Sequence, residues 1–172
     1  HFNDAAFVSI GELDDSKSTR METLRAAFEG AGVDVEISED INRALWEKLL
    51  MVTSWAGMGA LARSPIGDLR ADPETRQMID QSMDESIAVA NAHGIAINTS
   101  LKKVLWSFYD AMPGGATASL IRDMMEGKPS ELDAWNGAIH RIGQIHGVPT
   151  PPHSFVYQLL RPMERRAREA HP

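Results

Sequence analysis

The sequence contains no cysteine, so disulfide bonds and thiolate metal sites are excluded. Positive charge is also scarce, since 17 lysines and arginines stand against 24 aspartates and glutamates, for a formal net charge of −7. Without a basic surplus to neutralise phosphates, we expect no nucleic-acid partner and no binding to an anionic membrane. We also expect no metal site, because His93, His140, His146 and His153 show no metal-ligand spacing.

A long uninterrupted hydrophobic run is missing too. The most apolar segment, LWEKLLMVTSWAGMGALA at 45–62, contains Lys48, Thr53 and Ser54 and is followed by Arg63, which makes it a poor membrane span. We see no signal peptide. Because 43% of the 172 residues are hydrophobic, the chain can bury the core of one domain, or of one domain and part of another. These features predict a cytoplasmic protein without a membrane partner.

The first part of the chain, residues 1–38, reads as strand, helix and strand. AAFVSIGEL at 5–13 is a short β-prone run, STRMETLRAAFEGAG at 18–32 has apolar residues at helical spacing, and VDVEI at 33–37 alternates apolar and acidic residues. Two strands cannot bury both faces of a parallel sheet. We therefore predict that residues 1–38 are the trailing part of a larger α/β domain whose front lies outside this chain.

The second part, residues 39–172, lacks strand signals and predicts an all-helical domain of about six helices, so that the fold class is mainly α. Ser38 or Asp40 can cap the first long helix, and Pro65 ends it. Asp72 is the predicted N-cap of the next helix, with Pro73 at its first position, and Gly94, Gly127 and Gly147 are predicted to end helices. Ser130 with Asp133 forms a box-like helix start. The last helix is predicted to begin at about Ser154 and to end in a solvated segment, RPMERRARE at 161–169.

A lysine at the head of the most apolar helix raises a question about its role. Lys48 shares a helix face with Val52 and Ala56. It could extend its ammonium group to water from the exposed end of the helix. Alternatively it points into a cleft, where a lysine can protonate a carbonyl oxygen during reduction. GMGALA at 57–62 matches the loose dinucleotide fingerprint, but the required preceding strand is absent, so its glycines are predicted to allow close helix packing.

Several segments together resemble the ketopantoate reductase (2-dehydropantoate 2-reductase) family. They are INRALWEKL, RSPIGDLRADPETR and ASLIRDMMEGKPSELDAWNGAIHRIGQIHGVPTP, which are similar to the helical C-terminal domain, and SIGELDDSKSTRMETLRAAFEGAGVDVEISEDI, which is similar to the end of the NADPH-binding domain. The resemblance implies a C-terminal domain with the fold typical of 6-phosphogluconate dehydrogenase C-terminal domains. Residues 1–38 would then be the remnant of a Rossmann domain, with its phosphate loop outside the chain.

The same resemblance implies roles for three residues. Lys48, in the W-x-K-L element, falls on the family's catalytic lysine, and Glu131 falls on its catalytic acidic residue. Ser119 falls on the serine that contacts the substrate. Ser119 and Glu131 could equally serve as helix-start residues. Asp123, one turn after Ser119, either orients it or lies at the surface.

Three positions depart from the family pattern. Asparagines commonly follow the catalytic lysine one and two turns later, and another precedes the serine, but here Val52, Ala56 and Ala116 take these places. We predict that these three residues bind the substrate by lining an apolar pocket beside Lys48. Losing three amides should weaken recognition of ketopantoate itself. The substrate is then either ketopantoate or a bulkier, less polar 2-keto acid reduced by a paralogue.

The predicted function is therefore part of an NADPH-dependent reductase of a small 2-keto acid, as in pantothenate biosynthesis, and the resemblance allows a homodimer. The isolated chain is expected to be inactive, because the residues that bind the nucleotide phosphates lie outside it. One alternative is a non-catalytic helical module for dimerisation or ligand sensing that derives from this family. Another is a different oxidoreductase of the hydroxyacid dehydrogenase type, although the E-L-D element favours the ketopantoate reductases.

Overall fold

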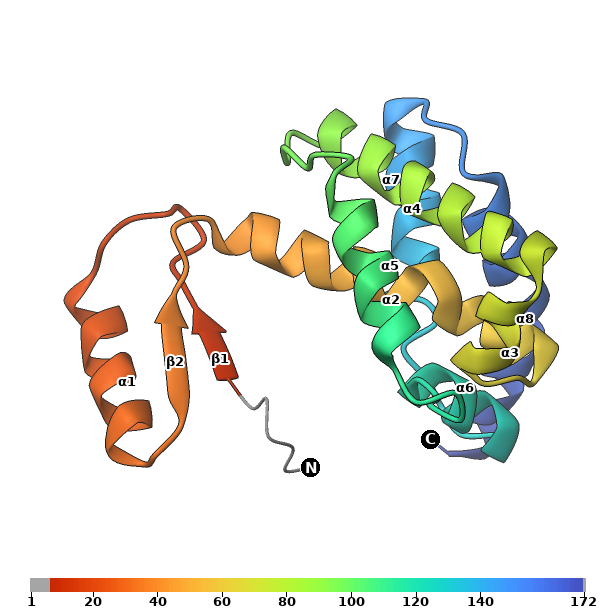
Figure 1. Cartoon of the computed structure of the whole chain (residues 1–172), viewed down its shortest axis with the longest axis horizontal. Helices are drawn as coiled ribbons and strands as arrows, with labels where there is room; N and C mark the ends of the chain where they lie inside the picture. The colour runs from red at the N-terminus through yellow and green to blue at the C-terminus, as the bar shows by residue number, and fades with distance from the viewer. Residues whose placement is uncertain (1–6, 172) are drawn as a thin grey trace. The chain divides into compact units, whose positions relative to one another are not determined.

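The computed structural model describes residues 7–171 and contains two compact units (Figure 1). The chain passes from the first unit to the second between Trp46 and Glu47, which lie inside helix α2 (Ile41–Ala62). The boundary predicted from sequence, between residues 38 and 39, precedes this helix. Lys48 therefore belongs to the second unit, close to the point where that unit begins.

The first unit consists of two parallel strands and a connecting helix. Strand β1 (Phe7–Ile10) pairs with β2 (Asp34–Ile37) in a register that runs from Phe7 opposite Asp34 to Ile10 opposite Ile37. Helix α1 (Thr19–Gly30) connects them, and the Ser18 side chain caps it by accepting a hydrogen bond from the Met21 amide at 3.3 Å. The predicted strand–helix–strand order is confirmed, while the first residues of the predicted N-terminal strand lie outside the described range.

Every secondary-structure element among the described residues of the second unit is a helix, as predicted. The unit contains the later part of α2 and six further helices, seven in all among the described residues, whereas the sequence predicted about six. The extra element is the short helix α3, which follows Pro65 directly. The helices are α3 (Ile66–Ala71), α4 (Pro73–Ala92), α5 (Leu101–Ala111), α6 (Ser119–Glu126), α7 (Asn136–His146) and α8 (Pro151–Ala170).

Several helix ends follow the residues that predicted them. The Asp40 carboxylate accepts a hydrogen bond from the Arg43 amide at 2.8 Å at the start of α2. The Asp72 carboxylate accepts from the Thr75 amide at 2.9 Å at the start of α4, just before Pro73. Gly127 and Gly147 end α6 and α7 with φ of 67° in both cases, a left-handed conformation that strains residues with a Cβ atom.

The start of α7 differs from the prediction. This helix begins at Asn136, not beside Ser130. Ser130 Oγ does accept the Leu132 amide at 3.2 Å, but Asp133 does not complete a capping box. The Asp133 carboxylate instead accepts hydrogen bonds from Tyr157 and Arg141, at 2.8 Å in both cases. Tertiary partners thus hold residues 130–135 as a connection between two helices.

The buried half of α2 forms the centre of the second unit. All residues from Thr53 to Ala60 are buried, so this part of the helix is enclosed nearly all round. The two glycines of GMG allow the close packing that was predicted for them. A Cβ atom on Gly57 would lie 2.3 Å from Val156 Cγ1 of α8, and a Cβ atom on Gly59 would lie 2.4 Å from Ile121 Cδ1 of α6.

Helices α4 and α5 are joined by polar and aromatic contacts. Helical spacing in the sequence puts Ile79, Met83 and Ile87 on the inner stripe of α4, and all three are buried. For α5 the same spacing predicts an inner face of Leu101, Val104, Leu105, Phe108 and Met112. Leu105 is buried as predicted, whereas Val104 and Phe108 are exposed and the structure buries Tyr109. Polar contacts join the two helices on the exposed side. Lys102 of α5 pairs with Asp80 and Asp84 of α4, and Trp106 Nε1 donates a hydrogen bond to Asp80. Arg76 of α4 lies over the Trp106 ring and pairs with Asp110.

Helix α8 is the element that sequence analysis described least well. It begins at Pro151, earlier than predicted, and its last turns are not a purely solvated end, because Glu164 and Ala167 are buried. Two prolines at its start leave His153 as the first residue with a backbone N–H. Glu85 of α4 accepts hydrogen bonds from this N–H at 3.1 Å and from His153 Nδ1 at 2.8 Å. A carboxylate from another helix thus caps α8.

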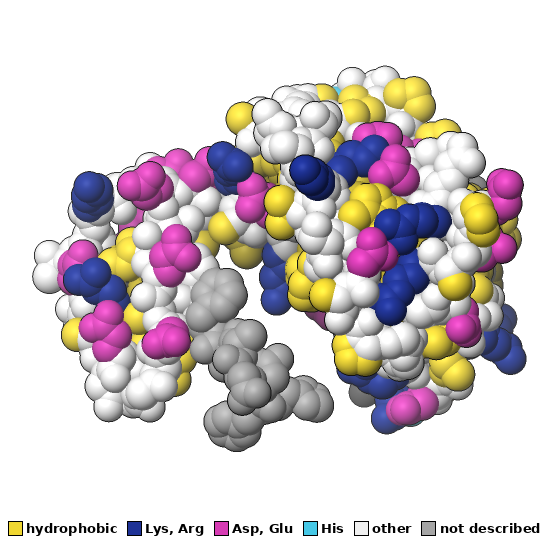
Figure 2. All heavy atoms as spheres, viewed as in Figure 1, with side chains coloured by type: hydrophobic (Ala, Val, Ile, Leu, Met, Phe, Trp, Pro, Cys, Tyr) yellow, Lys and Arg dark blue, Asp and Glu magenta, His cyan; other side chains and the backbone are white. Residues whose placement is uncertain are grey.

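Charged side chains of both signs are interspersed on the face of each unit that Figure 2 shows. Within the described residues, no helix has the length and apolar character needed to span a membrane.

Replacing Gly57 by alanine should destabilise the second unit. The added methyl group would overlap Val156 and approach Asn136 Oδ1 to 2.9 Å in a buried contact. Overpacking of this kind costs about 1–3 kcal/mol of the free energy of unfolding. The measurement is denaturant unfolding of the Gly57→Ala chain beside a Gly115→Ala control, since a Cβ atom on Gly115 meets nothing within 4 Å. Equal stability of the two variants would contradict the close contact between α2 and α8.

Candidate active site

Lys48 lies on α2 in the turn before the helix becomes buried. Its side chain is exposed, and within the described part of the chain it has no hydrogen-bond or ion-pair partner. The ammonium group is therefore available to a ligand, although the exposure by itself agrees with either role considered for this lysine. The absence of a carboxylate partner distinguishes Lys48 from Lys102, whose ammonium group is held by two aspartates.

Val52 and Ala56 follow Lys48 on the same side of α2, one and two helical turns later. Val52 is partly exposed, whereas Ala56 is fully buried. Val52 is thus the member of this pair that a ligand beside Lys48 can reach without a rearrangement of the helix. Ala56 lies one turn further on, in the buried half of the helix.

Tyr109 of α5 fixes α2 next to Val52, a contact that the sequence did not reveal. Its hydroxyl donates a 2.6 Å hydrogen bond to the Met51 carbonyl oxygen, and its ring packs edge-on against Trp55 with ring centroids 6.4 Å apart. Burial raises the pKa of the Tyr109 hydroxyl, so this group remains a donor throughout the physiological pH range. The tyrosine therefore anchors α2 between Lys48 and the buried half of the helix.

Ala116 and Ser119 lie where the α5–α6 connection enters α6. Ser119 is the first residue of α6 and is half-buried, and Ala116 precedes it in the connection. The Ala116 carbonyl oxygen accepts a hydrogen bond from the Ile66 amide at 3.0 Å, and the Gly114 carbonyl oxygen accepts from the Gly67 amide at 2.9 Å. These bonds fix the connection against the start of α3, which directly follows α2 in the chain.

The side chain of Asp123 makes no hydrogen bond to Ser119 among the contacts of the described residues. Ser119 therefore presents its hydroxyl without that partner.

Glu131 lies in the connection between α6 and α7, and its side chain is exposed. Its carbonyl oxygen accepts the Trp135 amide at 2.9 Å, which closes a turn. The residue before it, Ser130, is buried and bonded to Glu164 and Arg168 of α8. Sequence analysis missed Glu164, because it lies in a segment of charged residues that resembles an ordinary solvated helix end.

The structure thus places the six predicted site residues on three segments of the second unit: Lys48, Val52 and Ala56 on α2, Ala116 and Ser119 at the start of α6, and Glu131 in the α6–α7 connection. Across the described residues, no hydrogen bond or ion pair joins Lys48 to Ser119 or to Glu131.

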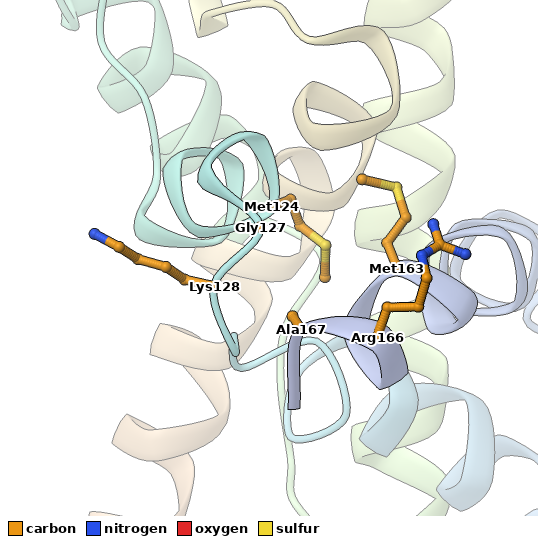
Figure 3. Close-up of a pocket in the computed structure, with 6 residues that line it drawn as sticks. All are labelled: Met124, Gly127, Lys128, Met163, Arg166 and Ala167. Carbon is orange, nitrogen blue, oxygen red and sulfur yellow. The ribbon is translucent and has the colours of Figure 1, made fainter. Parts of the chain in front are cut away.

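A small pocket in the same unit has a different lining. It has a volume of about 180 Å³ and lies where α6 and the start of the α6–α7 connection meet α8 (Figure 3). Its residues are Met124, Gly127, Lys128, Met163, Arg166 and Ala167, and none of the predicted site residues is among them. In Figure 3 the Lys128 side chain points away from the other labelled side chains, so the ammonium group does not join the arginine at the pocket.

The histidines and other metal-binding side chains do not assemble a metal centre in the described range, where no group of three or more could hold an ion. His93 and His146 nevertheless come together from the ends of α4 and α7, with 3.0 Å between Nδ1 and Nε2. Their separation by 53 positions hid this pair from an inspection of sequence spacing.

Comparison with known proteins identifies the family. The family described as "Ketopantoate reductase PanE/ApbA C terminal" matches residues 40–164, and the chain belongs to this family. The 2-dehydropantoate 2-reductase of Caulobacter vibrioides is 32% identical over 139 residues, which are 81% of this chain and 47% of that protein. The corresponding enzyme of Mesorhizobium japonicum is 28% identical over 153 residues, 89% of this chain and 46% of that protein.

A solved structure gives the same result for the fold. The 2-dehydropantoate 2-reductase of Geobacter metallireducens superposes with a TM-score of 0.82 at 33% identity, covering 90% of this chain and 52% of that one. The chain spans about half the length of the curated relatives it matches. Residues 40–164, which match the family, contain all six residues that were predicted from the sequence to form the site.

Removing the Tyr109 hydroxyl should weaken the second unit without disturbing its core. Tyr109→Phe leaves the Met51 carbonyl oxygen without this donor and should lower the free energy of unfolding by about 0.5–1.5 kcal/mol, the usual net value of a hydrogen bond. Ser107→Ala, which removes an exposed hydroxyl from the same helix, is the control. Thermal and denaturant unfolding measure both variants, and a Tyr109→Phe chain as stable as the control would show that the contact does not anchor α2.

Proposed function

We propose that this chain forms the substrate-binding and proton-donating part of an NADPH-dependent reductase of a 2-keto acid, acting on ketopantoate or a bulkier, less polar analogue. The observation that carries the proposal is the match of residues 40–164 to the ketopantoate reductase family together with the exposed, unpaired Lys48 in its W-x-K-L element. A lysine without a carboxylate partner at the edge of a buried helix is suited to meet a polar ligand.

Residues 1–38 are proposed to be the end of the Rossmann domain that would hold the nucleotide. The described part supplies two parallel strands and one helix, but no strand that turns through a glycine-rich loop into a helix. The GMG of residues 57–59 lies inside α2, where its amides are used by the helix. Neither the described part of residues 1–38 nor residues 57–59 fits the pyrophosphate of NADPH.

Lys48 is proposed as the general acid. As the keto carbon is reduced, its oxygen gains negative charge, and the Lys48 ammonium group donates the proton that turns this oxygen into a hydroxyl. Ser119 is proposed to donate a hydrogen bond to the substrate from the start of α6. Glu131 is the proposed acidic partner of the reacting centre. The three groups come from separate segments, so the substrate itself would bring them into one network.

The apolar residues explain the proposed substrate preference. Val52 offers a partly exposed methyl surface one turn from Lys48, and Ala56 closes the wall behind it. Ala116 is proposed to complete this surface from the α5–α6 connection. A ketopantoate hydroxyl would find no amide partner at these positions, whereas an apolar side chain of a larger keto acid would lose little on entering.

Lys48→Ala should lower kcat/KM for a 2-keto acid by roughly 10²-fold or more, the range for loss of a positioned proton donor. The measurement uses the two-domain enzyme, meaning this chain preceded by a complete nucleotide-binding domain, with NADPH. Lys103→Ala, which removes an exposed lysine of α5, is the control and should leave turnover unchanged. Unchanged turnover in the Lys48→Ala enzyme would show that Lys48 only extends its ammonium group to water, whereas a parent enzyme that turns over no 2-keto acid would favour a non-catalytic dimerisation or ligand-sensing module.

Val52→Asn should shift specificity toward ketopantoate. The new amide can pair with a polar substrate group, and one neutral hydrogen bond contributes about 0.5–1.5 kcal/mol, or roughly a 2- to 10-fold gain in the ratio of kcat/KM values. The ratio compares ketopantoate with a bulkier aromatic 2-keto acid in the two-domain enzyme. Val104→Asn, on the exposed face of α5, is the control. A parent enzyme that already prefers ketopantoate strongly, or a ratio that stays constant, would remove the basis for a paralogue with another substrate.

A further inference from the structure

Glu164 of α8 is a buried carboxylate with an unusual set of partners. Its side chain accepts hydrogen bonds from the Ser130 amide at 3.2 and 3.1 Å and from the Ser130 hydroxyl at 2.5 Å. Arg168, one turn later on α8, places Nε 2.6 Å from the same carboxylate. Only 5% of Glu164 is exposed, so these contacts replace the water that a carboxylate would otherwise keep.

Glu164 and its partner Arg168 both bind Ser130, a residue of the α6–α7 connection. The second terminal nitrogen of Arg168 donates a 2.8 Å hydrogen bond to the Ser130 carbonyl oxygen. The amide, the hydroxyl and the carbonyl of Ser130 are therefore each held by the Glu164–Arg168 pair. The backbone amide and the backbone carbonyl of this residue are thus both bonded to side chains of α8.

Ser130 directly precedes Glu131, whose side chain has no comparable support. Within the described residues, nothing donates a hydrogen bond to the Glu131 carboxylate. The backbone on either side therefore sets the position of the Glu131 Cα atom and the direction of its Cα–Cβ bond. On one side stands the fixed Ser130, and on the other a turn closed by the Trp135 amide on the Glu131 carbonyl oxygen at 2.9 Å. Without the contacts of Glu164 and Arg168, Ser130 and the backbone of Glu131 could shift, and the carboxylate would then extend from a different position.

We infer that Glu164, supported by Arg168, is a positioning residue that sets, through Ser130, the backbone position from which the Glu131 carboxylate reaches the substrate. This inference rests on the role proposed for Glu131 and extends it to α8, a helix that supplies none of the proposed reacting groups. A backbone that is held in place in advance reduces the reorganisation that the Glu131 side chain must undergo when the substrate binds.

The test is a double-mutant cycle in the two-domain enzyme with NADPH and a 2-keto acid. Glu164→Gln keeps the size of the side chain but loses the charge and one acceptor, so it cannot hold both Ser130 and Arg168. It should lower kcat at least tenfold in the parent. In a Glu131→Gln background the same substitution should lower kcat less than twofold, because a positioning residue has no effect once its target is gone.

Two controls separate this effect from a general loss of structure. Glu169→Gln removes an exposed carboxylate of α8 that pairs only loosely with Arg165, at 3.9 Å, and should leave kcat unchanged. Ser130→Ala removes the hydroxyl that donates to Glu164 but keeps the ion pair between Glu164 and Arg168. It should lower kcat in the same direction as Glu164→Gln and serves as the deciding variant if Glu164→Gln does not fold.

The outcomes distinguish the two levels of the account. If Glu131→Gln alone leaves kcat unchanged, the proposed role of Glu131 is wrong, and the positioning role fails with it. If Glu131→Gln lowers kcat while Glu164→Gln and Ser130→Ala do not, only the positioning role is overturned. An equal loss from Glu164→Gln in both backgrounds would also overturn it, because the residue would then act through the fold and not through Glu131.

Discussion

The contact of the two α2 glycines with neighbouring helices is the constraint on which the second unit depends. At Gly57 the backbone of α2 approaches Val156 of α8 and Asn136 of α7, and at Gly59 it approaches Ile121 of α6. A side chain at either position would push these helices away. Because Lys48 lies on the same rigid helix, the packing of its buried half determines where the lysine stands relative to α6 and the α6–α7 connection.

Helix α8 completes this arrangement through two buried carboxylates. At its start, Glu85 of α4 accepts the His153 backbone N–H and ring Nδ1, while Ser86 Oγ lies 3.2 Å from the other ring nitrogen. Near its end, Glu164 holds Ser130. Charge-assisted hydrogen bonds of this kind are stronger than neutral ones, and removing one partner leaves a buried charge unpaired. The helix is thus fixed at both ends to elements far away in the sequence.

Sequence predicted the elements whose signals are local. The side chains of Asp40 and Asp72 cap α2 and α4 as expected, and the two C-terminal glycines of α6 and α7 adopt the left-handed conformation. These features depend on hydrogen bonds and dihedral angles within a few residues. The fold class and the family also followed from the sequence, because the pattern of the helical domain extends over most of the chain.

Sequence failed where distant partners decide. On α5, Tyr109 is buried in place of Phe108 because its hydroxyl reaches the Met51 carbonyl oxygen. At Ser130 and Asp133 the capping pattern is used by α7 and α8 side chains and does not start a helix. Glu164 resembled a solvated acid among arginines. Lys48, Ser119 and Glu131 were assigned roles by family resemblance, and these roles are proposals, because no hydrogen bond or ion pair among the described residues joins the three side chains.

A structure of the two-domain enzyme with NADP⁺ and oxamate, an unreactive analogue of a 2-keto acid, tests the central claim most directly. The account predicts Lys48 Nζ within hydrogen-bond distance of the oxamate carbonyl oxygen, Ser119 Oγ and the Glu131 carboxylate in the same network, and Val52 against the ligand. A structure in which oxamate binds elsewhere, or in which Lys48 extends into solvent beyond hydrogen-bond reach of it, would contradict the account.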